Sequence, residues 1–217
     1  MSDRGAFVEL MIRSGVLRFG DFTLKSGRQS PYFFNLGSIA DGDGLGALGR
    51  AYADAIVTHG FAPDVIFGPA YKGIPIAVAT GIALAERHGR RVGVTFNRKE
   101  AKSHGEGGNL IGHTLDGARV LIVDDVMTAG TAVSEAVDIV SRTSARLLGV
   151  LVALDRRERM EGGLTAVQQM AKRLGVPVAS IVGLEDVIEF LDRSGADADS
   201  LARIRTYQRQ YCLMYAQ

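Results

Sequence analysis

Two adjacent carboxylates, Asp124 and Asp125, end an apolar run and are followed at once by small residues. The run at 120–123 indicates a buried strand, and ligands of open parallel sheets bind beyond the carboxyl ends of their strands. Residues 128–131 then offer two hydroxyls and several backbone N–H groups at the start of a predicted helix, which suits a phosphate dianion. Because two carboxylates repel a phosphate, we expect them to accept hydrogen bonds from sugar hydroxyls or to face a developing positive charge. A ribose phosphate meets both requirements.

A second group of side chains that could do chemistry lies in the polar segment 97–117. Arg98, Lys99, Lys102 and His104 place four potential cations within seven residues. A run of basic residues is usually a solvated surface, but cations on a closing loop can also neutralise an anionic leaving group while water is excluded. Long segments without apolar runs are usually functional or disordered in compact domains, so we interpret residues 98–117 as a mobile functional loop.

The elements that must position these residues follow from the alternation of apolar runs and helical patterns. Strands are predicted at 65–67, 91–96, 120–123, 147–154 and 177–182, with helices at 45–60, 74–88, 131–142 and 165–174 between them. This alternation predicts an α/β fold whose central, mostly parallel sheet is flanked by helices. Upstream we expect a short amphipathic helix before Gly15 and then short strands or a hairpin over 16–35. One or two closing helices are predicted over 184–215.

Composition limits the classes of partner and the compartment. The 25 basic and 24 acidic side chains nearly cancel, so no global field favours nucleic acid or an acidic membrane, and any anion site must be local. Cys212 is the only cysteine, and the opening residues MSDRGAFVEL lack the apolar core of a secretory signal. We therefore expect a cytoplasmic protein. No run approaches the roughly 18 apolar residues of a membrane span.

The acid pair followed by Thr-Ala-Gly-Thr resembles the 5-phosphoribosyl-1-diphosphate (PRPP) motif of type I phosphoribosyltransferases. Four further stretches resemble the orotate phosphoribosyltransferase family in order and spacing: FTLKSGRQSPYFFN (22–35), GPAYKGIPIA (68–77), NRKEAKSHGEGG (97–108) and LDRRE (154–158). The resemblance implies a single phosphoribosyltransferase domain over 1–217. Its parts would be an N-terminal hood of about 1–40 with the C-terminal tail packing nearby, and a core of about 41–183.

The resemblance also implies an activity and partners. Orotate and PRPP would give orotidine 5′-monophosphate and pyrophosphate in pyrimidine biosynthesis. Mg²⁺ would be held mainly by PRPP, with no direct protein ligand. The protein would be a homodimer in which the loop 98–108 reaches the neighbouring subunit's site. Within that loop, Ser103 stands where the family often has an acidic residue.

Site residues follow from the same resemblance. The catalytic residues would be Lys99, Lys102, His104, Asp124 and Asp125. PRPP would be bound by the following residues: Lys25, Tyr71, Lys72, Arg98, Lys99, Lys102, His104, Asp124, Asp125, Val126, Met127, Thr128, Ala129, Gly130, Thr131 and Ala132. Orotate would be bound by Lys25, Phe33, Phe34, Thr128 and Arg156, with Arg156 pairing with its carboxylate as a fork. Because adjacent strand residues point to opposite faces, only one of the two phenylalanines can readily face the base.

Two other sequence patterns resemble functional motifs but fit the chain less well. Gly44, Gly46 and Gly49 form a G-x-G-x-x-G, but no strand precedes them directly, as a dinucleotide-binding site requires. The acid pair together with Asp155 resembles the acidic residues of a signalling receiver domain. A receiver domain would leave the first half of the chain unexplained. A PRPP-binding regulatory protein, or a phosphoribosyltransferase for another base, remains as the alternative.

Overall fold

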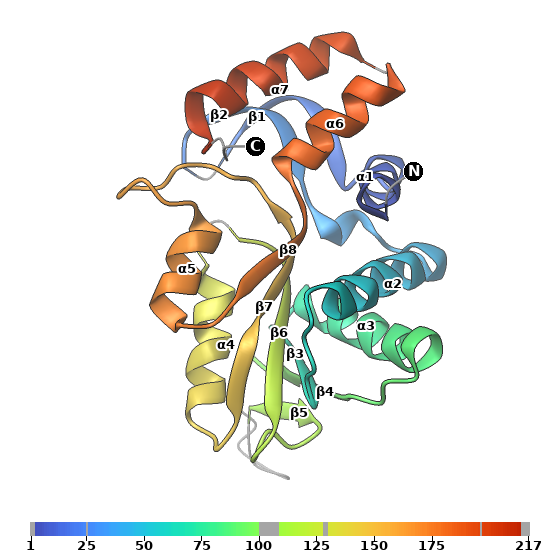
Figure 1. Ribbon diagram of the computed structural model, residues 1–217, viewed down its shortest axis with the longest axis vertical. Coiled ribbons are helices and arrows are strands. Elements are labelled where there is room, and N and C mark those ends of the chain that lie inside the picture. The colour runs from blue at the N-terminus through green and yellow to red at the C-terminus, as the bar shows by residue number, and fades with distance from the viewer. Residues whose placement is uncertain (1–2, 25, 100–108, 128–129, 196, 214–217) are drawn as a thin grey trace.

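A computed structural model of the chain describes residues 3–24, 26–99, 109–127, 130–195 and 197–213. Its centre is a six-stranded sheet in the order β5-β4-β3-β6-β7-β8 (Figure 1). The strands are β3 (Val65–Gly68), β4 (Gly93–Asn97), β5 (Leu110–Gly112), β6 (Arg119–Val126), β7 (Arg146–Asp155) and β8 (Val178–Gly183). All neighbours pair in parallel except β4 and β5, which are antiparallel. The predicted α/β fold with a mostly parallel sheet is confirmed.

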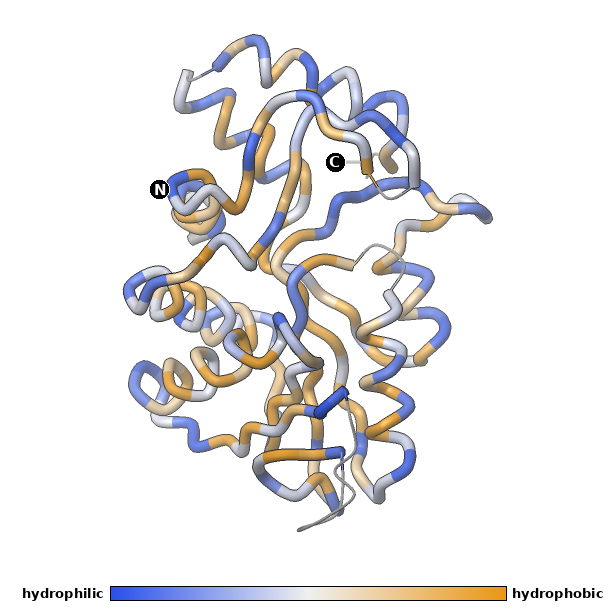
Figure 2. The backbone as a smooth tube through the Cα atoms, turned by 180° about the vertical axis from the view of Figure 1, so that it is seen from behind, coloured by the Kyte–Doolittle hydropathy of each residue, from blue (hydrophilic) through white to orange (hydrophobic). Residues whose placement is uncertain are grey.

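Helices cover both faces of this sheet. On one side lie α2 (Gly42–Thr58) and α3 (Gly73–His88), and on the other α4 (Thr131–Ser141) and α5 (Ala166–Leu174) (Figure 1). Along β6, Leu121 and Val123 pack into the core shared with α2 and α3, whereas Val120 and Ile122 pack into the core shared with α4. Because both faces of a central strand are buried, its sequence is a continuous apolar run, and the tube in the middle of the sheet is largely orange in Figure 2.

The chain's two ends come together in a second layer above the sheet. It contains α1 (Asp3–Arg13), the antiparallel pair β1 (Leu17–Thr23) and β2 (Gln29–Phe34), and the closing helices α6 (Leu184–Ser194) and α7 (Ala198–Tyr211). We call this set the hood; β8 runs directly into it through α6, and a 3₁₀ turn, η1 (Leu36–Ser38), leads from β2 towards α2 (Figure 1). The predicted first helix, hairpin and closing helices are therefore present. No helix in these described ranges has the length and apolarity needed to cross a membrane.

The prediction of a loop throughout 98–117 is wrong in its last part. Leu110–Gly112 form β5, paired with the edge of β4. Three residues leave no periodic signal in a sequence, and the strand exists because the open edge of β4 offers backbone partners. Leu115, which follows it, is 2% exposed and packs into the core on the α4 side.

Candidate active site

The acid pair lies at the carboxyl end of β6, where the sequence analysis placed it. Asp124 and Asp125 are 8% and 7% exposed. Each carboxylate accepts the next backbone N–H: Asp124 Oδ1 from Asp125 N at 2.9 Å, and Asp125 Oδ1 from Val126 N at 2.7 Å. From α2, the buried hydroxyl of Tyr52 donates to the backbone carbonyl of Asp124 at 2.6 Å. The strand end is thus fixed from both sides.

A cation from the turn after the neighbouring strand β3 pairs with one of these acids. Lys72 Nζ lies 2.7 Å from Asp125 Oδ2. Lys72 is in the turn between β3 and α3, where the backbone approaches itself so closely that a Cβ on Gly68 would lie 2.1 Å from the Gly73 carbonyl oxygen. Glycine is therefore required at Gly68, and the tight turn brings the lysine over the end of β6.

Burial and mutual repulsion change the protonation of the pair. Burial, followed by the neighbouring charge of Asp125, raises the pKa of Asp124 to about 6, although the Asp125 N–H and Lys72 act in the opposite direction. Burial next to the same two acids holds the pKa of the Tyr52 hydroxyl well above its usual value, so that it remains a hydrogen-bond donor. A buried acid with a raised pKa beside a cation is typical of a functional site.

The turn after the acids leads into α4. Gly130 has φ +68° and precedes Thr131, the first residue of the helix, as predicted. Ser134 donates both its backbone N–H and its hydroxyl to the Gly130 carbonyl, at 2.8 and 2.7 Å. Val126 and Met127 are described, and Met127 is buried, whereas Thr128 and Ala129 lie outside the described residues. α4 is the next helix or strand after β6 in the chain, and its first residue, Thr131, lies five positions after Val126, the last residue of the strand.

The root of the basic loop is fastened to the same edge of the sheet. Asn97 Oδ1 accepts the backbone N–H of Ala70 at 2.9 Å, which ties the end of β4 to the turn that carries Lys72. Next to it, Lys99 Nζ lies 5.2 Å from the centre of the Tyr71 ring, within cation–π distance. Two predicted PRPP-binding residues are thus brought together.

The remaining loop residues are placed only in part. The Arg98 backbone N–H donates to the Asn109 carbonyl at 2.7 Å, so the described chain on the two sides of residues 100–108 is joined by this hydrogen bond. Lys102 and His104 belong to that segment and lie outside the described residues, as does Lys25 in the hood.

Arg156, the predicted partner of a carboxylated base, follows the end of β7. Its guanidinium is buried and contacts Glu158 Oε1 through Nε and Nη2, both at 2.7 Å. Nη2 also donates to Ser30 Oγ at 3.2 Å, and the group lies 4.2 Å from the centre of the Tyr32 ring. Arg156 is therefore held against the hood by residues of β2.

The two phenylalanines predicted to contact the base have different surroundings, as expected for neighbouring residues on a strand. Phe34 is 7% exposed and belongs to the hydrophobic core. Phe33 is partly exposed and stacks on Phe22 with ring centres 5.4 Å apart, while Arg18 lies over its ring. Of the two rings, Phe33 is the one with surface left for a ligand.

Three residues of this region escaped the sequence analysis: Tyr52, Asn97 and Glu158. Tyr52 has the pattern of a core aromatic on an amphipathic helix, so no local signal distinguished it. Asn97 and Glu158 lie inside stretches already singled out, and polar residues just after strand ends are a usable signal. No three acidic, histidine or cysteine side chains gather as a metal site within the portion of the chain that the structure describes.

Comparison with known proteins relates the chain to phosphoribosyltransferases. A model of the phosphoribosyl transferase domain matches residues 35–161. The chain is 52% identical over 205 residues to an orotate phosphoribosyltransferase of Enterobacter sp. (strain 638), covering 94% of this chain and 96% of that protein. The crystal structure of orotate phosphoribosyltransferase from Francisella tularensis is similar with a TM-score of 0.84 and 34% identity, covering 96% of this chain and all of that one. The Mycobacterium tuberculosis enzyme in complex with PRPP gives a TM-score of 0.64 and 26% identity, covering 85% and 98% of the two chains.

Proposed function

The chain belongs to the orotate phosphoribosyltransferase family, and from this premise we propose that it transfers the 5-phosphoribosyl group of PRPP to orotate. The products are orotidine 5′-monophosphate and pyrophosphate, in pyrimidine (UMP) biosynthesis. The bond between the sugar's C1 and the diphosphate breaks with its electron pair leaving on the diphosphate. A ring nitrogen of orotate forms the new bond to C1 and loses its proton.

The observation that carries this proposal is the acid pair at the end of β6 beside Lys72. Asp124 and Asp125 are buried where the cationic sugar would form, and Lys72 lies 2.7 Å from one of them. Carboxylates fixed in advance stabilise such a charge better than water does, because they need not reorient as it develops. In this role both carboxylates bind the sugar hydroxyls, and the turn 126–132 holds the 5′-phosphate at the start of α4.

The diphosphate end of PRPP is assigned to the turn after β3 and to the basic loop. Tyr71 and Lys72 are 67% and half exposed respectively, so both are open to a ligand. Arg98 and Lys99 follow β4 at the same edge, and Lys102 and His104 supply two more cations of the segment between Lys99 and Asn109. Together these groups neutralise the charge of the departing diphosphate.

Orotate is a flat pyrimidine with a carboxylate, and the hood offers groups of matching chemistry. Arg156 supplies a planar fork for the carboxylate and Phe33 an aromatic surface for the ring. Lys25 and Thr128 are assigned to the base as well. Since Phe34 is in the core, its contribution is to the packing under β2.

Mg²⁺ is the cofactor implied by the family, and the donor groups of this site fit an ion that arrives on the diphosphate. Asp125 is already balanced by Lys72, so its carboxylate is charge-neutralised without a metal. When bound, Mg²⁺ would offset the charge of the diphosphate. Lys72 and Tyr71 would hold the ligand that carries it.

We assign the active form to a homodimer on the basis of α3. Val78 and Ile82, one helical turn apart, are 40% and 55% exposed, and Tyr71 stands at the start of the same helix. A second copy seated on this apolar surface would lie near Tyr71 and Lys99, which contact each other, and the family resemblance assigns the loop 98–108 to the partner's site.

The buried free thiol of Cys212 suits the reducing cytoplasm, to which we assign the protein.

An absorbance assay tests the function directly. Purified protein with PRPP and Mg²⁺ is expected to consume orotate and to leave uracil, hypoxanthine and adenine unchanged. Consumption of a purine instead of orotate would make the protein a phosphoribosyltransferase for another base. PRPP binding without consumption of any base would make it a regulatory protein.

A further inference from the structure

Glu158 is the centre of a polar cluster between the core and the hood. Its Oε1 accepts from Arg156 and from the Tyr207 hydroxyl, each at 2.7 Å, and its Oε2 accepts from Arg28 at 3.2 Å. The Glu158 side chain is 16% exposed and that of Arg156 is 8% exposed. A buried carboxylate with three donors is held in one position, since each contact removes rotational freedom from the side chain.

The geometry of the Arg156 fork shows which part is taken. Glu158 contacts Nε and Nη2, which form the side edge of the planar guanidinium. The end of the fork, formed by Nη1 and Nη2, is the other edge that can bind a carboxylate with two parallel hydrogen bonds. Of these two atoms, Nη2 also contacts Ser30 Oγ at 3.2 Å, which is longer than the 2.7 Å contacts with Glu158. An arginine held by one edge offers the other at a fixed angle.

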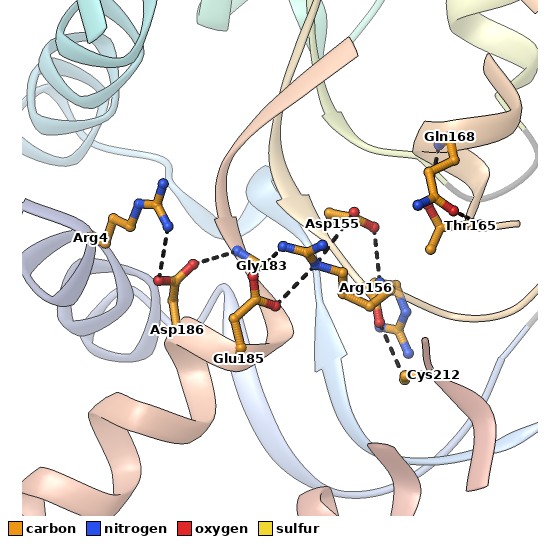
Figure 3. A network of polar contacts seen from close by, with 10 residues as sticks. Arg4, Asp155, Arg156, Thr165, Gln168, Gly183, Glu185, Asp186 and Cys212 are labelled. Atoms are coloured by element: carbon orange, nitrogen blue, oxygen red, sulfur yellow. Dashed lines mark hydrogen bonds and ion pairs between the residues drawn. The ribbon is translucent and has the colours of Figure 1, made fainter. Parts of the chain in front are cut away.

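The backbone around this pair is equally constrained. Arg157 adopts φ +58°, a left-handed conformation that is uncommon for a residue with a side chain. Its N–H is accepted by Asp155 Oδ1 at 2.9 Å, and its Nε donates to Glu185 at the start of α6 at 3.0 Å. Figure 3 shows Glu185 and Asp155 on one side of this turn. On the other side, the thiol of Cys212 is directed at the Arg156 backbone. The turn that carries Arg156 and Glu158 is therefore fastened by β7, α6 and the end of α7.

We propose that Glu158 is a positioning residue for base recognition: it holds Arg156 by the side edge, so that the end of the fork meets the carboxylate of the base. Arg28 and Tyr207 hold Glu158 in turn. Loss of the Glu158 charge weakens the contact that holds the guanidinium, and an amide nitrogen in place of one carboxylate oxygen takes away an acceptor from the surrounding donors. The recognition of the carboxylate then weakens more than the recognition of phosphate or ribose.

This inference rests on the proposed function. Binding of two nucleotides tests the inference separately from that function. Orotidine 5′-monophosphate and uridine 5′-monophosphate differ only in the carboxylate on the base, so the ratio of their dissociation constants measures its recognition. Calorimetric titration of Glu158→Gln is expected to show orotidine 5′-monophosphate binding weakened about tenfold, with uridine 5′-monophosphate within about twofold of wild type. In steady state, KM for orotate rises while KM for PRPP stays the same.

Glu185→Gln is the matched control, because it makes the same change next to Arg157 instead of Arg156. It is expected to leave the ratio of the two dissociation constants as in wild type. Tyr207→Phe removes one donor to Glu158 and preserves the ring, so it should weaken the preference for orotidine 5′-monophosphate by a smaller factor than Glu158→Gln. It takes the place of Glu158→Gln if that variant does not fold.

The outcomes are distinguishable. If wild type prefers orotidine 5′-monophosphate and Glu158→Gln, or Tyr207→Phe in its place, retains the full preference, the positioning role is wrong. An equal loss in Glu185→Gln also overturns it, because the effect would then belong to the fold of the whole turn. If wild type itself shows no preference and consumes no orotate, the proposed function fails instead.

Discussion

At the scale of single residues, the acid pair is maintained at a cost in stability. Two carboxylates that are each less than a tenth exposed lie side by side, and only Asp125 has a cation at 2.7 Å. Desolvation and like charge both oppose ionisation, as the raised pKa of Asp124 indicates. A chain selected for stability alone would not keep this arrangement, which agrees with a role in stabilising positive charge on a ligand.

The destabilisation caused by the buried Asp124 carboxylate can be measured from the pH dependence of protein stability. The folded pKa of Asp124 is about 6 against an ordinary 3.8, so the folded state binds the proton more tightly than the unfolded state. The stabilising contribution is complete below pH 4 and is lost as pH rises through 6. Asp124→Asn is therefore expected to raise the melting temperature by several degrees at pH 8, equivalent to about 3 kcal/mol, with little change at pH 4.

Asp64→Asn is the control for that experiment. Hydrogen bonds from Arg119 lower the pKa of the exposed Asp64 to about 2, so its contribution is present above pH 4 and is lost as pH falls through 2. We expect no stabilisation at pH 8 in this variant. A melting temperature of Asp124→Asn at or below that of wild type at pH 8 would contradict the account of the acid pair.

At the scale of elements, the packing of α2 against α3 explains a glycine pattern that resembled a nucleotide-binding motif. Gly44, Gly46 and Gly49 all lie inside α2. A Cβ on Gly49 would be 2.4 Å from the Ala79 carbonyl oxygen of α3, whereas a Cβ on Gly46 would meet only the flexible end of Arg50 at 3.2 Å. One of the three glycines thus serves a close helix crossing, and the spacing has no ligand role here.

Alanine substitutions at Gly49 and Gly46 are expected to change the stability of the protein in opposite directions. Gly49→Ala is expected to destabilise the protein by about 1–3 kcal/mol, because α2 and α3 must move apart. Gly46→Ala is expected to stabilise it by up to about 1 kcal/mol, because alanine favours helix. Urea unfolding of both variants measures the difference, and equal effects would show that the crossing is not limited by Gly49.

At the scale of the whole molecule, the exposed apolar surface of α3 is the basis for the proposed dimer. Ile82→Glu is expected to shift the protein towards monomer in analytical ultracentrifugation and to reduce turnover in parallel, since a buried charge without a partner opposes association. Ala202→Glu, an exposed position on α7, is the control and should leave the oligomeric state unchanged. A dimer that is equally strong in Ile82→Glu would remove α3 from the interface.

Sharing of the loop between subunits predicts complementation. Lys102→Ala chains and Asp124→Asn chains are each expected to lose most of their turnover, because one lacks a loop cation and the other an acid of the pair. After the two are unfolded and refolded together, mixed dimers contain one site with both residues intact, so up to about a quarter of wild-type turnover should return. Absence of recovery would indicate that the loop acts within its own subunit.

The fold class, the family and the position of the acid pair could all be predicted from the amino-acid sequence. Strand, acids, turn and helix from 120 to 142 are contiguous, so short-range pattern and chain order suffice to place them at the sheet's carboxyl edge. The helices and strands around them were predicted for the same reason. Among the described elements, β5 was missed because a three-residue edge strand is created by its partner and carries no period of its own, and the 3₁₀ turn η1 was not predicted either.

Which side chains contact one another could be learned only from the folded protein. Lys72 and Asp125 are 53 positions apart, and Tyr52 and Asp124 are 72 apart, and no local pattern relates residues at such separations. The same is true of Arg156, whose charge was predicted to be available to a ligand but whose side edge is already held by Glu158 against the hood. Partners of this kind depend on how layers pack, and packing is set by the whole core at once.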